Sequence, residues 1–138
     1  MESITWRMQA TNLKETITLL GELKYGVVEV TASALYGIAE EVMTRSKDIV
    51  PVDTGALKST GHVELPKIVG PIVEVTLGYG GVAANGEKVG YAYYVHENPD
   101  AHHDEPTQWK YLETPLNQKM GKIDHLLAQA IAELVALR

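Results

Sequence analysis

The sequence predicts an α+β fold, in which a small antiparallel β-sheet with a long β-hairpin packs against two long helices. Residues 12–49 and 113–137 carry apolar side chains three and four positions apart, which is the spacing of one helix face. Between them, residues 61–96 alternate apolar and polar side chains, as half-buried strands do. The 138 residues contain no internal repeat or linker, so a single domain over residues 1–138 is expected.

Composition argues against several classes of function. The chain has no cysteine, which removes disulfides, thiolate metal sites and cysteine nucleophiles. Its formal net charge of −6 argues against non-specific binding of nucleic acid, which requires Lys and Arg to neutralise phosphates. No apolar run reaches the length of about 18 residues that marks a membrane span. The aromatic residues are seven Tyr and two Trp with no Phe, a set that suits half-buried surfaces and interfaces.

The N-terminal half is predicted to be a short strand followed by helix. Apolar and polar residues alternate over residues 1–9, and helical spacing begins at residue 12. The longest amphipathic stretch covers residues 22–49. Residues 27–31 are rich in β-branched side chains, so a break at Gly26 followed by a strand is an alternative. The apolar stripe keeps its helical phase across Gly26, so one helix is preferred. Pro51 ends this helix, because the residue before a proline is disfavoured in the helical conformation.

Residues 50–60 are predicted to form a structural corner made by Pro51, Asp53, Thr54 and Gly55. Asp53 or Thr54 is expected to cap a short helical turn, and Gly55 to allow a tight bend into the sheet. Asp-Thr-Gly is also the active-site string of aspartic proteases, in which two aspartates face each other and share one proton. This chain has a single such string, so only a homodimeric peptidase fits. Its place after a long helix argues against an all-β peptidase fold.

The next part of the chain is predicted to be sheet with a mobile arm. Residues 72–79 and 88–95 are expected to pair as a β-hairpin, with residues 78–87 as its glycine-rich arm. The arm lacks the Lys-Ser/Thr ending of a P-loop, so no nucleotide site is expected. This arm and the polar loop over residues 97–110 are candidate subunit interfaces. The candidate interface residues are Tyr79, Gly80, Gly81, Asn85, Gly86, Lys88, His96, His102 and His103.

One segment of the second half is rich in residue types that bind metals. The group consists of His96, Glu97, Asp100, His102, His103, Asp104 and Glu105. Histidines and carboxylates at this density can bind zinc or a harder cation. A loop rich in Pro, Asp and His is more often simply solvated, and no His-Glu-x-x-His string is present on a helix. We therefore predict no metal, no cofactor and no catalytic residue.

Three segments resemble a tailed-bacteriophage family that is variously described as head–tail joining, neck, tail-component, minor capsid or tail-completion protein. Residues 49–59, which contain Pro-Val-Asp-Thr-Gly-Ala-Leu, are similar to its first block. Residues 91–97 (YAYYVHE) resemble its second block, a strand, and residues 110–116 (KYLETPL) resemble its third, where the last helix begins. The blocks occur in the family's order within about residues 22–135. Tyr111 stands where the family often has Phe.

The resemblance implies a non-enzymatic structural protein of the virion. Such a protein assembles as a homo-oligomeric ring between portal and tail, or completes the tail. The implied partners are further copies of the chain and neighbouring connector, portal-side or tail-tube proteins, with non-specific proximity to viral DNA and no membrane. The implied location is the head–tail interface or tail end of the virion, after assembly in the host cytoplasm. The alternative is a homodimeric aspartic peptidase that uses Asp53, Thr54 and Gly55.

Overall fold

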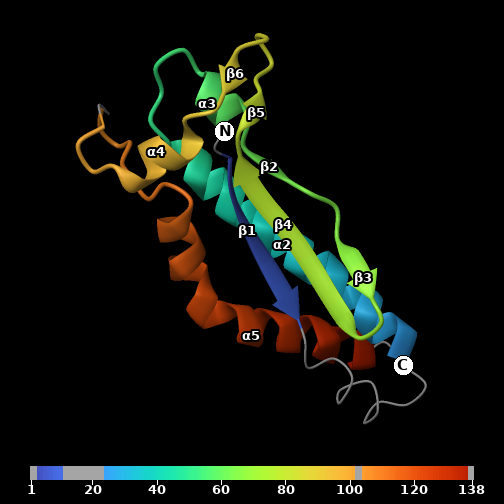
Figure 1. The fold of residues 1–138 in the computed structure, drawn as a ribbon. Helices are drawn as coiled ribbons and strands as arrows, with labels where there is room; N and C mark the ends of the chain where they lie inside the picture. Colours follow the sequence, from blue (N-terminus) through green and yellow to red (C-terminus); the bar gives the residue numbers. More distant parts are fainter. Residues whose placement is uncertain (1–2, 11–23, 102–103, 137–138) are drawn as a thin grey trace.

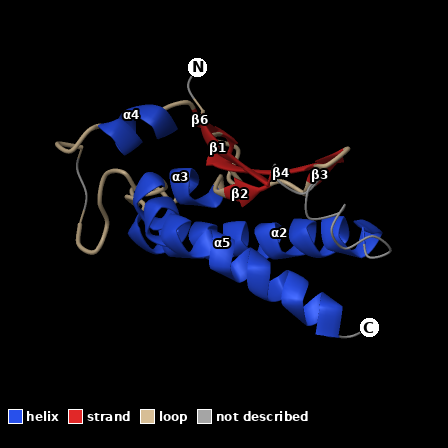
Figure 2. Ribbon diagram, turned by 90° about the horizontal axis from the view of Figure 1, so that it is seen from below, coloured by secondary structure: helices blue, strands red, loops and turns tan. Residues whose placement is uncertain are grey.

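A computed structural model describes residues 3–10, 24–101 and 104–136, and these form an α+β fold (Figure 1). The long helix α2 lies between an antiparallel sheet and the C-terminal helix α5 (Figure 2). In chain order the elements are β1 (Ile4–Ala10), α2 (Lys24–Ile49), α3 (Ala56–Ser59), β2 (His62–Val63), β3 (Lys67–Val69), β4 (Ile72–Tyr79), β5 (Gly81–Val82), β6 (Lys88–Val89), α4 (Ala92–Glu97) and α5 (Glu113–Ala136). No described helix is both long and apolar enough to cross a bilayer.

Helix α2 runs without a break through Gly26, so the alternative of a strand after this residue is wrong. Its apolar stripe is buried on both sides, against β4 and against α5, and this tertiary burial outweighs the weak helix propensity of β-branched residues. Gly26 allows close packing, because a Cβ there would lie 3.1 Å from the Leu134 side chain of α5. The helix ends at Ile49, before Pro51, as the sequence predicts. The part of the predicted helix before Lys24 lies outside the described residues.

Strand β4 is the centre of the sheet. It pairs with β1 along seven residues, from Ile4 opposite Tyr79 to Ala10 opposite Val73. On its other side it pairs with β2 and β3. Three residues, 64–66, lie opposite two residues of β4 between these short strands, which is a β-bulge. The β4 side chains alternate between buried and half-buried up to Leu77, as expected for a strand with one face on the core.

The predicted hairpin between residues 72–79 and 88–95 is wrong. β4 pairs with β1 instead, and β6 is two residues long and pairs with β5. Residues 92–97 form helix α4 rather than a strand. Ala92 and His96, four positions apart, are the buried residues of this helix, and this is helical spacing. The sequence pattern indicates a strand here because tyrosines 91, 93 and 94 count as apolar positions. The ring of Tyr is apolar, but its hydroxyl can remain in water, so these residues need not be buried.

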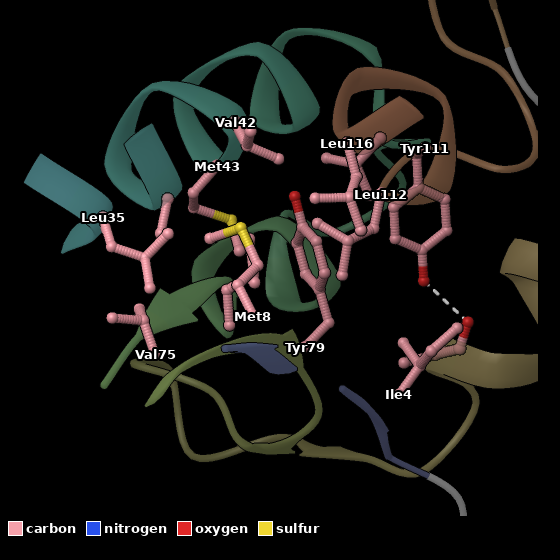
Figure 3. Close-up of a cluster of buried hydrophobic side chains, with 14 of the residues drawn as sticks. Ile4, Met8, Leu35, Val42, Met43, Val75, Tyr79, Tyr111, Leu112 and Leu116 are labelled. Carbon is pink, nitrogen blue, oxygen red and sulfur yellow. Dashed lines mark hydrogen bonds between the residues drawn. The ribbon is translucent and has the colours of Figure 1, made fainter. Parts of the chain in front are cut away.

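The core lies between the sheet and α2 and is closed at one end by the beginning of α5. Figure 3 shows α2 side chains facing those of β1 and β4, with Tyr111 and Leu112, just before α5, and Leu116 of α5 beside them. The labelled core residues are Ile4, Met8, Leu35, Val42, Met43, Val75, Tyr79, Tyr111, Leu112 and Leu116. The core therefore joins elements from both ends of the chain.

Candidate interaction site

Three segments that are far apart in sequence meet at the end of α2 (Figure 1). They are the corner over residues 50–60, helix α4, and residues 104–116 before and at the beginning of α5. The Gln108 amide donates a hydrogen bond to the Ile49 carbonyl, at 2.8 Å, and the Lys110 amide donates to the His96 carbonyl, also at 2.8 Å. The Tyr111 hydroxyl donates to the Ala92 carbonyl at 2.6 Å. We call this end of the molecule the junction.

At the corner, Gly55 takes the bend and Thr54 supplies the side-chain contact to the helical turn. Gly55 has φ 85°, in the left-handed region that favours glycine, and precedes α3. The Ala56 amide donates to the Thr54 hydroxyl at 3.2 Å. The Asp53 side chain is exposed and makes no cap on α3. Of the two predicted capping residues, Thr54 therefore serves this turn, and Asp53 is left facing solvent.

Two of the predicted interface residues, Tyr79 and His96, are fully buried inside the junction. Tyr79 shares a hydrogen bond of 2.7 Å with the Ser46 hydroxyl, and its ring meets that of Tyr111 edge-on at 5.0 Å. The His96 ring lies between those of Trp6, which is tilted to it at 5.0 Å, and Tyr111, which meets it edge-on at 4.9 Å. Burial raises the pKa of both tyrosines. These side chains are part of the chain's own core and are not available to a neighbouring subunit in this fold.

Both ring nitrogens of His96 have partners. The Glu113 amide donates to Nε2 at 3.2 Å, so Nε2 carries no proton. Nδ1 then carries the proton and donates to Glu97 Oε1 at 3.0 Å. Burial lowers the pKa of His96, although Glu97 acts in the opposite direction, so the ring is neutral at pH 7.

Three charged side chains, Glu97, Lys110 and Glu113, lie next to this histidine and interact with one another. Lys110 Nζ lies 2.5 Å from Glu97 Oε2 and 3.2 Å from Glu113 Oε2. Hydrogen bonds from Lys110 and then His96 lower the pKa of Glu97. The group ties α4 to the first turn of α5. Within this group both ring nitrogens of His96 have hydrogen-bond partners from the chain itself.

Beside the buried cluster, a surface cleft of ≈ 580 Å³ separates the corner from α4. We call it the corner cleft. Its lining consists of Pro51, Val52, Asp53, Thr54, Gly55, Leu57, Tyr91, Tyr94, Val95, Asn98, Asp100 and Ala101. These residues include two carboxylates and no basic side chain. Val52 and Tyr94 are 52% and 64% exposed, so the cleft offers apolar surface with an acidic character.

The tyrosines of the corner cleft are held in place by hydrogen bonds. Tyr91 donates to Glu87 Oε2 at 2.9 Å, and Thr54 donates to the other oxygen of Glu87 at 3.3 Å. The Asn98 amide donates to the Tyr94 hydroxyl at 2.8 Å. Burial and the Glu87 carboxylate raise the pKa of Tyr91 to about 12, so its hydroxyl remains a donor at neutral pH. The cleft is therefore preformed, which lowers the entropic cost of binding.

The remaining predicted interface residues lie near this cleft or outside the described residues. Gly81, Asn85, Gly86 and Lys88 are exposed on the β5–β6 hairpin, and Gly80 is half-buried just before it. His102 and His103 lie outside the described residues. Within residues 3–10, 24–101 and 104–136, no group of three or more His, Asp or Glu side chains is placed to hold a metal ion.

Sequence reasoning missed the cleft residues Val52, Tyr91, Tyr94, Asn98 and Asp100 as a set. The signal that could have found them is the run of tyrosines at 91, 93 and 94, too many for one buried face. Comparison with family models, with curated proteins and with solved structures gives no match. The likeness to the phage family therefore rests on the three segments alone.

Proposed function

We propose that this chain is a non-enzymatic structural protein of a tailed-phage or prophage virion, which acts by assembling as a ring at the head–tail connector or at the tail end. The observation that carries the proposal is the convergence of the three family-like segments at the junction. Residues 49–59 and 91–97 supply most of the lining of the corner cleft. Lys110 and Tyr111 of the third segment donate hydrogen bonds to the His96 and Ala92 carbonyls of the second, and Gln108, just before the third segment, donates to the Ile49 carbonyl of the first. If the resemblance is confined to these three segments, we expect the structural unit that they form together to be the part shared with the family.

The chemistry of the junction supports binding rather than catalysis. His96, Tyr79 and Tyr111 are buried and have hydrogen-bond partners within the chain. What the junction offers to solvent is a preformed cleft with tyrosine rings, and Tyr is enriched at protein interfaces. We propose further copies of the chain and neighbouring connector, portal-side or tail-tube proteins as partners. DNA is not proposed as a specific ligand, because the net charge is −6.

Deletion of the gene from the phage or prophage that carries it tests the proposal. We expect DNA-filled heads and tails that fail to join, or unfinished tails, by negative-stain electron microscopy. Expression of the wild-type chain from a plasmid is the control and should restore complete virions. Complete, infectious particles in the deletion strain would contradict the proposal.

The peptidase alternative is tested with the purified chain. It predicts peptide cleavage that pepstatin inhibits and that the Asp53→Ala variant lacks. We expect no cleavage by either protein, while the wild type forms rings in mass photometry and negative-stain images. Pepstatin-sensitive cleavage that depends on Asp53 would replace the structural proposal.

A further inference from the structure

The end of the molecule that carries β3 exposes an apolar segment. Leu65, Ile68 and Val69 are 77%, 49% and 69% exposed, and Lys67 between them is also exposed. We call residues 65–69 the β3 segment. Among the described residues β3 pairs with β4 alone, so its outer backbone edge is open. An open edge with large apolar side chains favours association with another chain.

The β3 segment and the corner cleft lie at opposite ends of the molecule. Figures 1 and 2 both show β3 far from α3 and α4, with the length of α2 between them. Helix α2 has 26 residues and therefore spans about 40 Å. The β3 segment cannot reach the corner cleft of its own chain without unfolding the sheet, because β3 is paired with β4.

The two surfaces are complementary in charge, and both offer apolar side chains. The β3 segment presents aliphatic side chains and one cation, Lys67. The corner cleft presents the rings of Tyr91 and Tyr94, and its charged lining residues are Asp53 and Asp100. Its ≈ 580 Å³ lies within the range of about 300–1,000 Å³ that is typical of binding pockets.

We propose that the corner cleft of one copy receives the β3 segment of a second copy of this chain. This inference rests on the proposed function and specifies the contact between ring subunits. The two surfaces are different and lie at opposite ends of the molecule. Each copy therefore binds one neighbour through its corner cleft and the other through its β3 segment. Such a head-to-tail contact produces a ring if its rotation closes and a filament if it does not. Lys67 meets the acidic side of the cleft, and the aliphatic side chains cover Val52 and the tyrosine rings.

Engineered disulfides test the contact directly, because the chain contains no cysteine. Val52→Cys places a thiol in the corner cleft and Val69→Cys places one on the β3 segment; both valines are exposed. On mild oxidation, a mixture of the two single variants should give a covalent heterodimer, and the double variant a ladder of covalent oligomers. The matched control replaces Val69→Cys by Val135→Cys, at an exposed valine of α5. No covalent product above this control would overturn the inference.

A charge-reversal cycle supplies the second test. Lys67→Glu should weaken self-association, measured by analytical ultracentrifugation, by about tenfold through repulsion from the cleft carboxylates. Adding Asp53→Lys and Asp100→Lys to Lys67→Glu should restore association. Lys122→Glu, at an exposed lysine of α5, is the charge-matched control and should associate as the wild type does.

The outcomes separate this inference from the proposed function. Rings that persist in Lys67→Glu, with no disulfide between positions 52 and 69, would overturn the inference while ring assembly stands. A deletion phage that still makes complete virions would remove the proposed function, and the disulfide result would still decide whether two copies meet through these surfaces. Circular dichroism of each variant verifies folding, since all substituted side chains are exposed.

Discussion

The junction and the β3 end are stabilised in different ways. At the junction, tyrosines 79 and 111 and His96 are buried and hydrogen-bonded to partners from other parts of the chain. At the other end, β3 is held by backbone pairing to β4, and its three side chains are exposed. Both regions contain large side chains with apolar surface; the junction buries Tyr79 and Tyr111, whereas β3 leaves all three of its side chains exposed.

The difference shows that side chains at the junction stabilise the fold, whereas those of β3 remain available for contacts with another chain. Buried polar groups at the junction would cost free energy if a partner were lost, so this region specifies one arrangement of α4 and α5. The exposed side chains of β3 contribute little to the free energy of unfolding, because folding leaves much of their surface in water, with Ile68 and Val69 49% and 69% exposed. Substitutions should therefore have large effects on stability at the junction and small ones at β3.

The largest effect is expected from Tyr111→Ala. Removal of this fully buried ring should lower the free energy of unfolding by about 3–5 kcal/mol, as other large-to-small core substitutions at aromatic residues do. Chemical denaturation measures the loss. Tyr111→Phe keeps the ring and removes only the hydrogen bond to the Ala92 carbonyl, so it should cost about 1 kcal/mol. Equal losses for the two variants would show that the ring is not packed as described.

A pH effect is expected from His96. Burial lowers its pKa in the folded chain, so the unfolded chain, with an ordinary pKa of about 6.5, binds the proton more readily. The contribution of neutral His96 to stability is complete above about pH 6.5 and is lost as the pH falls from there towards the folded pKa. Melting temperature measured between pH 7.5 and 5 should decrease accordingly.

The control for this pH effect is His125, which is exposed on α5. His125→Gln should leave the pH dependence of melting unchanged, while His96→Gln should flatten it in the range where histidine titrates. A pH profile that is the same in His96→Gln and in the wild type would contradict the description of His96 as buried and neutral.

A smaller effect is expected at the corner. Thr54→Ala removes the oxygen that accepts the Ala56 amide and should cost about 0.5–1.5 kcal/mol. Asp53→Ala should change stability by less than about 0.5 kcal/mol, because Asp53 is exposed and caps no helix. If Asp53 capped the helical turn, its replacement would lower stability by more than this. Thermal denaturation of the two variants side by side distinguishes the assignments, and a greater loss in Asp53→Ala would reverse them.

The smallest effect is expected at β3. Val69→Ser should change the free energy of unfolding by less than about 0.5 kcal/mol, because the valine is already 69% exposed. The same variant should reduce self-association if the β3 segment binds a second copy. A marked loss of stability in the dilute monomer would show that β3 contributes to the fold more than its exposure indicates.

The sequence predicts the two long helices well because their periodicity persists over many turns and no residue in them reverses it. It also places β1 and the corner. It fails at α4, where amphipathic tyrosines hide a helical burial pattern of Ala92 and His96. It fails again at the partner of β4, because strand pairing was inferred from neighbours in sequence, whereas β1 occupies that position. Apolar alternation marks a strand but does not specify its partner.

The candidate site was predicted in part. The corner and the glycine-rich hairpin were singled out, but His96 and Tyr79 were expected at an interface and are in the core. A single sequence gives no sign that a histidine will find both a backbone amide and a carboxylate from other elements. The corner cleft likewise needs the distance between residues 51–57 and 91–101, which only the folded chain provides.

The pairing of β1 with β4 has a consequence for synthesis of the chain. β1 leaves the ribosome before its partner β4, which follows only after α2, α3, β2 and β3 have been made. Until then Ile4 and Met8, which the fold buries, have no core to enter. Tyr111, whose ring meets that of Tyr79, emerges later still. Closing so long a loop carries an entropic cost that slows folding, so the apolar side chains of β1 remain open to premature association until β4 has been made.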